Sequence, residues 1–326
     1  MNNTLTDVPG ILVGHATHLE GATGCTVILC PLGTVGGVDQ RGGGPGTRET
    51  DLLRPTRGME QVNAVLLAGG SAFGLAAADG AMRYLEEHET GYRAISGVIV
   101  PIVPTAIVFD LLVGQPGIRP DAAMGYAACE AAVSDPVPQG TVGAGTGCRI
   151  GAMWGNEFAM KGGVGSASVD LGDGLVVAAL MVVNAVGDIL NEHGAIMAGM
   201  RQQDGNGFAD MLHQFKSLAQ VIPPQAGREN TVIGVVATNA RLSKAHINKV
   251  AEMGQAGVAR VVRPAHTMHD GDTLFSLATG EIPANVSVVG AYAAEVVATA
   301  IRNAVRAAVS LGGVRSWQEI NSSFKV

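Results

Sequence analysis

The chain has 326 residues, of which 47% are hydrophobic and 15% charged, and its formal net charge is −7. This length accommodates one large domain or two medium ones, and the apolar fraction excludes a disordered chain. The acidic net charge, without a basic patch, argues against a nucleic-acid partner. A membrane-spanning helix is not predicted, because the sequence has no uninterrupted run of about 18 apolar residues.

The first ten residues carry neither the basic stretch nor the apolar core of a signal peptide, so we expect a cytoplasmic protein. The four cysteines, Cys25, Cys30, Cys129 and Cys148, are not spaced as CxxC, and in a chain of this length they do not predict a disulfide framework. Glycine contributes 46 residues and aromatic residues only 4%, so the core must consist of small aliphatic side chains in closely packed layers.

Six short apolar runs predict β-strands that are buried on both faces. They lie at residues 25–30, 64–68, 97–101, 175–183, 231–238 and 273–279. Helical periodicity predicts helices at residues 71–87, 120–133, 243–254 and 286–308, with Ser71 and Ser243 as N-caps. This alternation predicts an α/β protein in which helical layers enclose one or two mixed sheets.

Residues 201–230 are the most polar part of the chain, with a short helix expected at 208–219 and two prolines at 223–224. We expect this segment to form an exposed loop that is accessible to proteases. It ends at Asn230, directly before the apolar strand that begins with Thr231.

Thr231 has two interpretations. Threonine favours strands, which alone explains its position. Alternatively, Thr231 is an N-terminal nucleophile: if the bond after Asn230 is cut, its free α-amine, with an ordinary pKa of about 7.7–8.0, can act as the base for its own hydroxyl. The uncut chain could then cleave itself, because the Thr231 hydroxyl can attack the Asn230 carbonyl and form an ester that water resolves.

The segment 266–272 concentrates two histidines and two aspartates, His266, His269, Asp270 and Asp272. One interpretation is a metal-dependent hydrolase, although the spacing is not that of a helical HExxH motif. The other is that Asp270 and Asp272 orient and polarise the amine and hydroxyl of a nucleophile. We favour the second interpretation and expect no metal and no cofactor.

Three further polar residues stand in apolar or glycine-rich surroundings. Ser71 follows a strand, but Phe73 replaces the second glycine of a GxSxG motif, so capping or lining of a substrate pocket is favoured over nucleophilic catalysis. Asn184 interrupts an apolar run and either forms a turn or donates its amide to an oxyanion. Lys161 precedes two glycines and is either a solvated loop residue or a charge held at a site.

Several segments, taken in order, together resemble one family: residues 8–17 (VPGILVGHAT), 46–53 (GTRETDLL), 67–87 (LAGGSAFGLAAADGAMRYLEE), 103–111 (VPTAIVFDL), 142–147 (VGAGTG), 183–194 (VNAVGDILNEHG), 230–240 (NTVIGVVATNA) and 266–275 (HTMHDGDTLF). The chain resembles the L-aminopeptidase/D-amidase-esterases, β-peptidyl aminopeptidases and nylon-oligomer hydrolases from about residue 7 to 308. The resemblance implies a four-layer α/β/β/α sandwich similar to N-terminal nucleophile hydrolases but with different connectivity. It also implies one hydrolase domain, 1–326, that cuts itself into chains 1–230 and 231–326.

The resemblance also assigns roles to individual residues. Asn184 matches the asparagine that helps to form the oxyanion site, and Lys161 matches the lysine near the nucleophile in nylon-oligomer hydrolases. Asp270 and Asp272 match the two aspartates of that same branch. Phe109 falls near the active-site tyrosine of some members, which puts a phenol-assisted oxyanion site in doubt.

We therefore expect a self-processing N-terminal-threonine hydrolase that acts on small peptides or linear amide oligomers through an acyl-enzyme. L-aminopeptidase or β-peptidyl aminopeptidase action by the same mechanism is an alternative. A further alternative is a relative that keeps the pocket and binds a small molecule without turnover. The family's habit of forming tetramers predicts a homo-oligomer, and no nucleic acid or membrane partner is expected.

Overall fold

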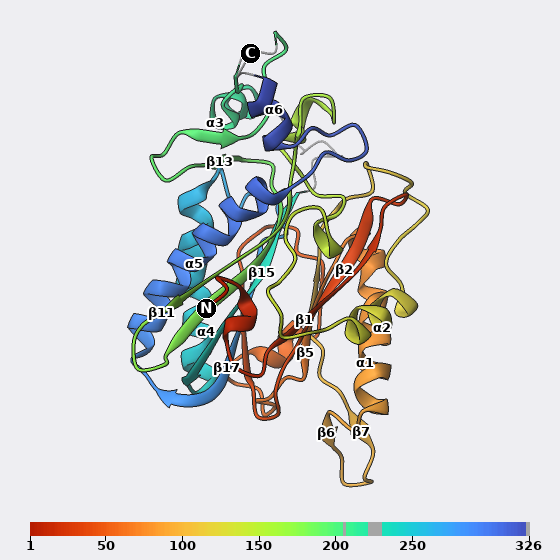
Figure 1. The fold of residues 1–326 in the computed structure, drawn as a ribbon, viewed down its shortest axis with the longest axis vertical. Helices are drawn as coiled ribbons and strands as arrows, with labels where there is room; N and C mark the ends of the chain where they lie inside the picture. Colours follow the sequence, from red (N-terminus) through yellow and green to blue (C-terminus); the bar gives the residue numbers. More distant parts are fainter. Residues whose placement is uncertain (205–206, 221–229, 324–326) are drawn as a thin grey trace.

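Two five-stranded β-sheets pack face to face in the computed structural model, which describes residues 1–204, 207–220 and 230–323 (Figure 1). Across the first sheet the strands are β1 (Leu12–His18), β2 (Thr23–Leu29), β5 (Ala64–Ala68), β8 (Thr105–Ile107) and β4 (Thr47–Arg48). Across the second they are β11 (Gly163–Asp170), β12 (Val176–Asn184), β15 (Thr231–Arg241), β17 (Thr273–Pro283) and β3 (Val35–Gln40). In the second sheet β15 and β17 run parallel, and the other neighbours are antiparallel.

Four helices complete the layers. Helices α1 (Ala77–Glu87) and α2 (Ala122–Glu130) pack on the first sheet, and α4 (Lys244–Val261) and α5 (Val286–Ala307) pack on the second (Figure 1). The order of layers is therefore α/β/β/α, which confirms the prediction of a four-layer sandwich. Each apolar sheet face finds a partner, either the other sheet or a helical layer.

Smaller elements connect these layers. The short strands are β6 (Tyr92–Arg93), β7 (Ile99–Val100), β9 (Arg149–Ile150), β10 (Met160–Lys161), β13 (Asp188–Leu190), β14 (Ile196–Ala198) and β16 (Val262–Arg263). The short helices are α3 (Met211–Phe215) and α6 (Trp317–Ser323). The 3₁₀ turns are η1 (Leu5–Asp7), η2 (Thr50–Leu53), η3 (Ser71–Ala76), η4 (Gly143–Gly145), η5 (Ala152–Trp154) and η6 (Lys216–Leu218).

Strand β15 shows why the central strands are apolar at nearly every position. Ile233 and Val235 pack between the two sheets, whereas Val232 and Val236 pack toward α4 and α5. Burial of each such side chain stabilises the fold by roughly 1.5–3 kcal/mol. Because side chains alternate along a strand, Thr231 lies on the same face as Ile233, at the end of the space between the sheets.

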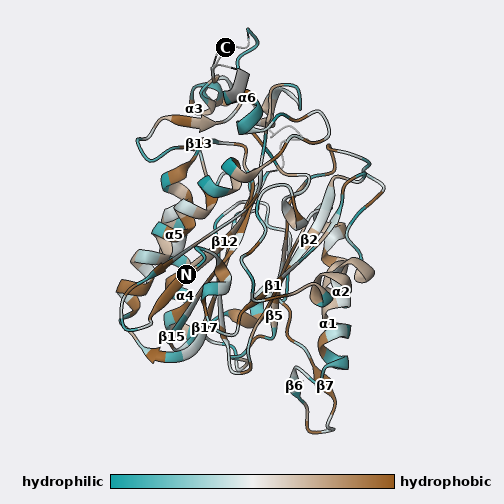
Figure 2. Cartoon of the chain, in the orientation of Figure 1, coloured by the Kyte–Doolittle hydropathy of each residue, from teal (hydrophilic) through white to brown (hydrophobic). Residues whose placement is uncertain are grey.

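Helix α5 is long and apolar enough, by length and composition, to cross a membrane. In the fold, however, it covers β11 and β12 and packs against α4, and its Val297 and Ile301 are fully buried. Figure 2 shows α5 with both hydrophobic and hydrophilic residues, the pattern of a helix that covers a sheet and faces water on its other side.

The predicted buried strand at residues 97–101 is wrong. Only Ile99–Val100 is a strand, and it pairs with β6 in a hairpin that projects beyond α1 (Figure 1). Ile95 at its tip is fully exposed. Gly97, with φ +80°, supports the turn of this hairpin, so the apolar run pairs locally and never enters a main sheet.

The predicted helix at 71–87 begins as a 3₁₀ turn and becomes an α-helix only at Ala77. Its expected cap is also wrong: the N-cap position of the turn is Gly70, and Ser71 has φ +54°. By contrast, Ser243 caps α4 as predicted and accepts a hydrogen bond from the His246 amide at 3.3 Å. The helix expected at 208–219 is the pair α3 and η6, and the loop prediction for residues 221–229 lies outside the described residues.

Candidate active site

Thr231 and Asn184 lie opposite each other at the ends of two neighbouring strands. Thr231 is the first residue of β15, and its Cα partner Asn184 is the last residue of β12, so Asn184 does not form a turn. The exposed fraction is 4% for Thr231 and zero for Asn184. The Thr231 hydroxyl donates a hydrogen bond to the carbonyl oxygen of Asn230, the residue that precedes it. The hydroxyl therefore lies beside the peptide group that self-cleavage would attack.

The Asn230 carbonyl oxygen has a second donor, the backbone amide of Gly271 at 3.0 Å. The Asn230 amide in turn donates to the carbonyl oxygen of His269 at 3.1 Å, and Asn230 forms a parallel bridge with Asp270. These bonds clamp the peptide before Thr231 to the segment 269–271. A fixed N–H aimed at a carbonyl oxygen is the arrangement that stabilises a developing oxyanion.

The Asp272 carboxylate, 1% exposed, ties the residue after Thr231 to the loop before β17. Its Oδ1 accepts a hydrogen bond from the Val232 amide at 2.7 Å. Its Oδ2 accepts one from the His266 amide at 3.0 Å and lies 2.9 Å from His266 Nδ1. The carboxylate thereby fixes the start of β15, and the His266 ring adds a partner for its charge.

Asp270 is the second buried carboxylate of this segment. Its Oδ2 accepts a hydrogen bond from the Thr267 amide at 2.7 Å. Burial raises the pKa of Asp270 well above its usual value, and the neighbouring charge of Asp272 raises it further, while the bonds to Thr267 lower it. Asp270 therefore holds a proton more readily than an exposed aspartate does.

The carboxylates of Asp270 and Asp272 are committed to backbone amides and to His266. Among residues 1–204, 207–220 and 230–323, no three or more His, Cys, Asp or Glu side chains gather in a group that could hold a metal ion. The geometry therefore gives the metal-site interpretation of His266, His269 and the two aspartates no further support.

A run of glycines packs against the acidic segment. The Gly44 amide donates to the Asp270 carbonyl oxygen at 2.8 Å, and the Gly43 amide donates to the Thr267 carbonyl oxygen at 3.0 Å. A Cβ added to Gly42 would stand 2.1 Å from the Asp270 carbonyl oxygen. Only glycine permits this approach of two backbones.

The Asn184 side-chain amide is fixed at both ends. Its Oδ1 accepts a hydrogen bond from the Arg149 amide at 3.0 Å, and its Nδ2 donates to the Phe109 carbonyl oxygen at 3.0 Å. An amide nitrogen carries two hydrogens, so the bond to Phe109 uses only one of them. Phe109 contributes its backbone to this arrangement.

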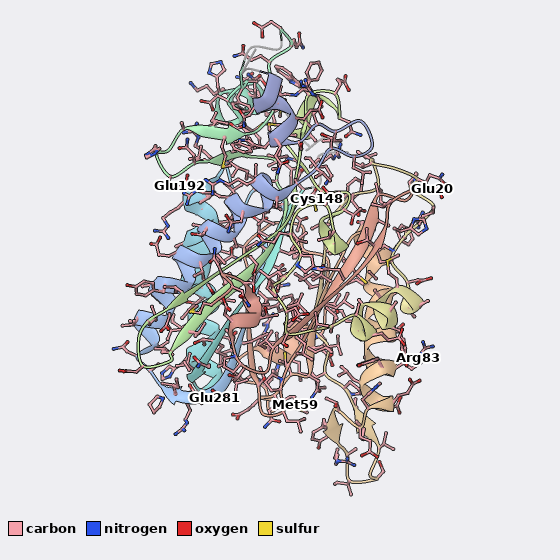
Figure 3. The ribbon with its side chains drawn as sticks, viewed as in Figure 1. Glu20, Met59, Arg83, Cys148, Glu192 and Glu281 are labelled. Atoms are coloured by element: carbon pink, nitrogen blue, oxygen red, sulfur yellow. The ribbon has the colours of Figure 1, made fainter. Side chains whose placement is uncertain are left out.

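Lys161 is fully buried and is not a solvated loop residue. Its Nζ donates to the carbonyl oxygens of Gly145 at 3.1 Å, Cys148 at 2.7 Å and Gly162 at 3.0 Å. Burial lowers the pKa of Lys161 to about 8, and the charges of Cys148 and Asp110 act in the opposite direction. Figure 3 labels Cys148 in the interior between the two sheets.

Asp110 is a buried carboxylate that sequence reasoning missed. Its Oδ2 accepts a hydrogen bond from the Thr23 hydroxyl and its Oδ1 one from the Gly70 amide, both at 2.7 Å. Burial raises the pKa of Asp110 to about 6. Its signal was an acidic residue inside the apolar segment 105–113, directly after Phe109.

Ser71 stands apart from this cluster. It is partly buried on η3, and its amide donates to the Val108 carbonyl oxygen at 3.0 Å. Within the described ranges, no hydrogen bond joins Ser71 or Lys161 to Thr231. The structure thus brings Thr231 together with Asn184, Asn230 and the two aspartates, and it places Lys161 in a neighbouring backbone cage.

Comparisons with known proteins agree over nearly the whole chain. The model of peptidase family S58 matches residues 3–318. An uncharacterized aminopeptidase of Mycobacterium leprae is 46% identical, covering 97% of this chain and 93% of the relative. A 6-aminohexanoate-oligomer endohydrolase of Kocuria sp. is 33% identical, covering 92% of this chain and 85% of the relative.

Solved structures share the fold. A β-aminopeptidase of Burkholderia sp. superposes with a TM-score of 0.73 at 24% identity, covering 100% of this chain and 94% of the other. The L-aminopeptidase D-Ala-esterase/amidase of Ochrobactrum anthropi, described as a new variant of the Ntn hydrolase fold, gives a TM-score of 0.76 at 20% identity, with 99% and 94% covered. These similarities confirm the predicted fold class.

Proposed function

This chain belongs to peptidase family S58 and hydrolyses peptide or amide bonds, and from that premise we propose that it is a self-processing hydrolase with Thr231 as its N-terminal nucleophile. The observation that carries the proposal is the hydrogen bond from the Thr231 hydroxyl to the Asn230 carbonyl oxygen, which also accepts from the Gly271 amide. Nucleophile, target and oxyanion donor therefore lie together in the uncut chain.

Self-cleavage follows from this arrangement. The Thr231 hydroxyl oxygen attacks the Asn230 carbonyl carbon, and the Gly271 amide stabilises the negative oxygen of the tetrahedral intermediate. The bond to the Thr231 nitrogen breaks, and the proton of the hydroxyl passes to that nitrogen. Water then hydrolyses the ester, which releases the carboxylate of Asn230 and leaves Thr231 with a free α-amine and a free hydroxyl.

The mature enzyme uses the same groups on an external amide. The Thr231 α-amine takes the hydroxyl proton, the hydroxyl oxygen attacks the substrate carbonyl, and the amine returns the proton to the leaving nitrogen. The free hydrogen of the Asn184 amide stabilises the oxyanion. Asp272 holds the Val232 amide at 2.7 Å and so fixes the direction of Thr231, with Asp270 beside it. The buried charge of Lys161 tunes the field around them.

The proposed substrates are small peptides or linear amide oligomers. The paired aspartates, Asp270 and Asp272, favour nylon-oligomer-like substrates over β-peptides and ordinary N-terminal peptides, which the same chemistry would also cleave. We extend the proposal to a cytoplasmic homotetramer of processed units that needs no cofactor. Phe109 and Ser71 are the proposed pocket residues.

One set of measurements tests the proposal. Mass spectrometry of the purified protein should find chains that begin at Met1 and at Thr231, and Thr231→Ala should remain intact and inactive. Thr238→Ala is the matched control, because Thr238 is also buried on β15 and donates its hydroxyl to the Val176 carbonyl oxygen at 2.7 Å. An intact chain with full activity would refute the mechanism.

A kinetic panel of aminoacyl-nitroanilides, β-peptides and aminohexanoate oligomers then assigns the substrate. Preference for the aminohexanoate oligomers supports the proposed substrate class. Preference for the aminoacyl-nitroanilides or the β-peptides would instead identify the enzyme as an aminopeptidase. Complete processing without turnover of any panel member would identify the protein as a binding homologue.

A further inference from the structure

A cavity of about 890 Å³ lies beside α6, and none of the residues of the candidate active site lines it. Its apolar wall includes Met160, Met197, Phe208 and Trp317, and two arginines, Arg201 and Arg306, also line it. This volume falls within the range of roughly 300–1,000 Å³ that is typical of small-molecule sites.

Strand β10 separates the cavity from the polar cluster around Lys161. Met160 lines the cavity, whereas the next residue, Lys161, directs its Nζ to the carbonyl oxygens of Gly145 and Cys148. Successive side chains of a strand point to opposite faces. The cavity is therefore a separate feature, on the other face of this strand.

The two arginines differ in how their charges are balanced. Arg306 Nη2 lies 2.6 Å from Glu192 Oε1, and Figure 3 labels Glu192 at the end of the molecule that carries β13. Arg201 donates through Nη2 to the Glu157 carbonyl oxygen, and no carboxylate of the described part of the chain lies within 4.0 Å of its guanidinium. Arg201 therefore presents a positive charge that lacks an ion-pair partner there.

The groups around Arg201 also leave its positive charge uncompensated. Burial lowers the pKa of Arg201, and the positive charge of Arg315 acts in the same direction. Glu319 opposes them, but its Oε1 lies 2.7 Å from Arg315 Nε, and its Oε2 accepts a hydrogen bond from the Ser310 hydroxyl. A guanidinium in this position gains most from a ligand that carries one negative charge.

We propose that this cavity binds an aliphatic monocarboxylate, with its carboxylate on Arg201 and its hydrocarbon chain against Met160, Met197, Phe208 and Trp317. The single uncompensated arginine suits one carboxylate better than a polyphosphate, which requires several cations. The apolar wall suits an alkyl chain, which gains free energy by leaving water. This proposal is independent of the reaction at Thr231.

The chain contains two tryptophans, so Trp154→Phe leaves Trp317 as the only one and makes its fluorescence a reporter of the cavity. Titration of this variant with octanoate should give a saturable change in fluorescence. Octanol, which has the same chain without the charge, should bind at least tenfold more weakly. The absence of a saturable response to octanoate, or equal binding of octanol, would overturn the proposal.

Arg201→Gln in the same background should weaken octanoate binding at least tenfold while octanol binding stays unchanged, which shows that the cavity is intact. Arg201→Lys keeps the charge and should restore part of the octanoate affinity. The matched control is Arg241→Gln, because Arg241 also donates its guanidinium to backbone carbonyl oxygens, those of Gly280 and Glu281, outside the cavity. Equal octanoate affinity of Arg201→Gln and Arg241→Gln would refute the assignment of Arg201.

Discussion

Asn184 and Thr231 face each other across the antiparallel pair of β12 and β15. The same register places both side chains on the face between the two sheets, and a slip by one residue would turn one of them toward α4 and α5. The hydroxyl and the amide that the proposed mechanism needs are thus positioned by the pairing of two central strands that are buried where they meet.

We predict that Asn184→Ala slows both self-cleavage and amide hydrolysis by about 100-fold or more, because removal of one oxyanion donor has effects of that size. Time courses of fragment formation on denaturing gels and steady-state rates check this. Asn239→Ala is the control: Asn239 lies on β15, the strand next to that of Asn184, accepts a hydrogen bond from the Val176 amide at 2.9 Å and donates one to the Gly174 carbonyl oxygen at 2.8 Å. Equal losses in both variants would indicate a structural role alone.

Gly271→Ala should slow the appearance of the two fragments at least tenfold. A Cβ at this position would stand 3.0 Å from both Thr231 Oγ1 and the Gly44 carbonyl oxygen, and the resulting shift would move the amide that donates to Asn230. Gly58→Ala, where a Cβ would meet nothing within 4 Å, should process at the normal rate. Unchanged processing of Gly271→Ala would remove this amide from the mechanism.

Lys161→Met should lose a pH dependence of stability that the wild type shows. The folded pKa is about 8, whereas an exposed lysine titrates near roughly 10.4. The unfolded chain therefore binds more protons between these values, and the free energy of unfolding rises with pH across this window. Urea titrations of both proteins at several pH values within it measure the difference. A constant difference between them would contradict the predicted titration of this lysine.

Lys244→Met is the control for Lys161→Met, because it tests whether loss of a lysine bound to backbone carbonyl groups affects stability alone or activity as well. Lys244 Nζ also donates to three carbonyl oxygens, those of Leu52, Arg57 and Met59. Lys161→Met leaves the buried Gly162 carbonyl oxygen without its lysine donor, at a cost of about 1–3 kcal/mol, whereas Lys244→Met uncovers carbonyl groups of residues that are partly buried or exposed. Only Lys161→Met should also reduce hydrolysis in the fraction that remains folded.

Asp110→Asn should show the opposite pH trend. The folded pKa of Asp110 is about 6, above the value of roughly 3.9 for an exposed aspartate, so the folded state binds more protons between these values. The stability that Asp110 contributes is present below about pH 4 and is lost as pH rises through about 6. The difference in unfolding free energy between wild type and Asp110→Asn should shrink across this window. A difference that grows with pH would contradict the raised pKa.

Prolonged dialysis against EDTA should leave hydrolysis unchanged. The Asp272 carboxylate already accepts hydrogen bonds from the Val232 and His266 amides, and the Asp270 carboxylate accepts one from the Thr267 amide. We therefore expect these oxygens to bind backbone amides and not a metal ion. Loss of activity that zinc or manganese restores would instead favour the metal-dependent hydrolase.

Local signals predicted the central strands well. Residues 64–68 form a strand with the predicted ends, because Val and Leu fill every inner position and Gly69 follows. The N-cap at Ser243 could also be predicted, because its hydrogen-bond partner, the His246 amide, is only three residues away. The strand predicted at 97–101 had the same apolar composition, but composition does not reveal whether a run pairs within a hairpin or within a central sheet.

Long-range contacts could not be read from the sequence. The run 42–44 meets the segment 267–272 because β3 pairs with β17, which lies more than two hundred residues further along the chain. Lys161 and Asp110 each acquire an altered pKa from burial by distant segments, which no local pattern encodes. Sequence alone therefore named candidate residues, but it missed Asp110 and left the partners and protonation of the others open.

Thr231 is only 4% exposed, and its hydroxyl is engaged by the Asn230 carbonyl oxygen. On the proposed mechanism the newly made chain is therefore a dormant zymogen, since no external substrate can reach the hydroxyl before the strand start is freed. Activation consumes a peptide bond and cannot be reversed under cellular conditions. Each molecule would thus switch on once, after folding is complete, without a separate activating protease or inhibitor.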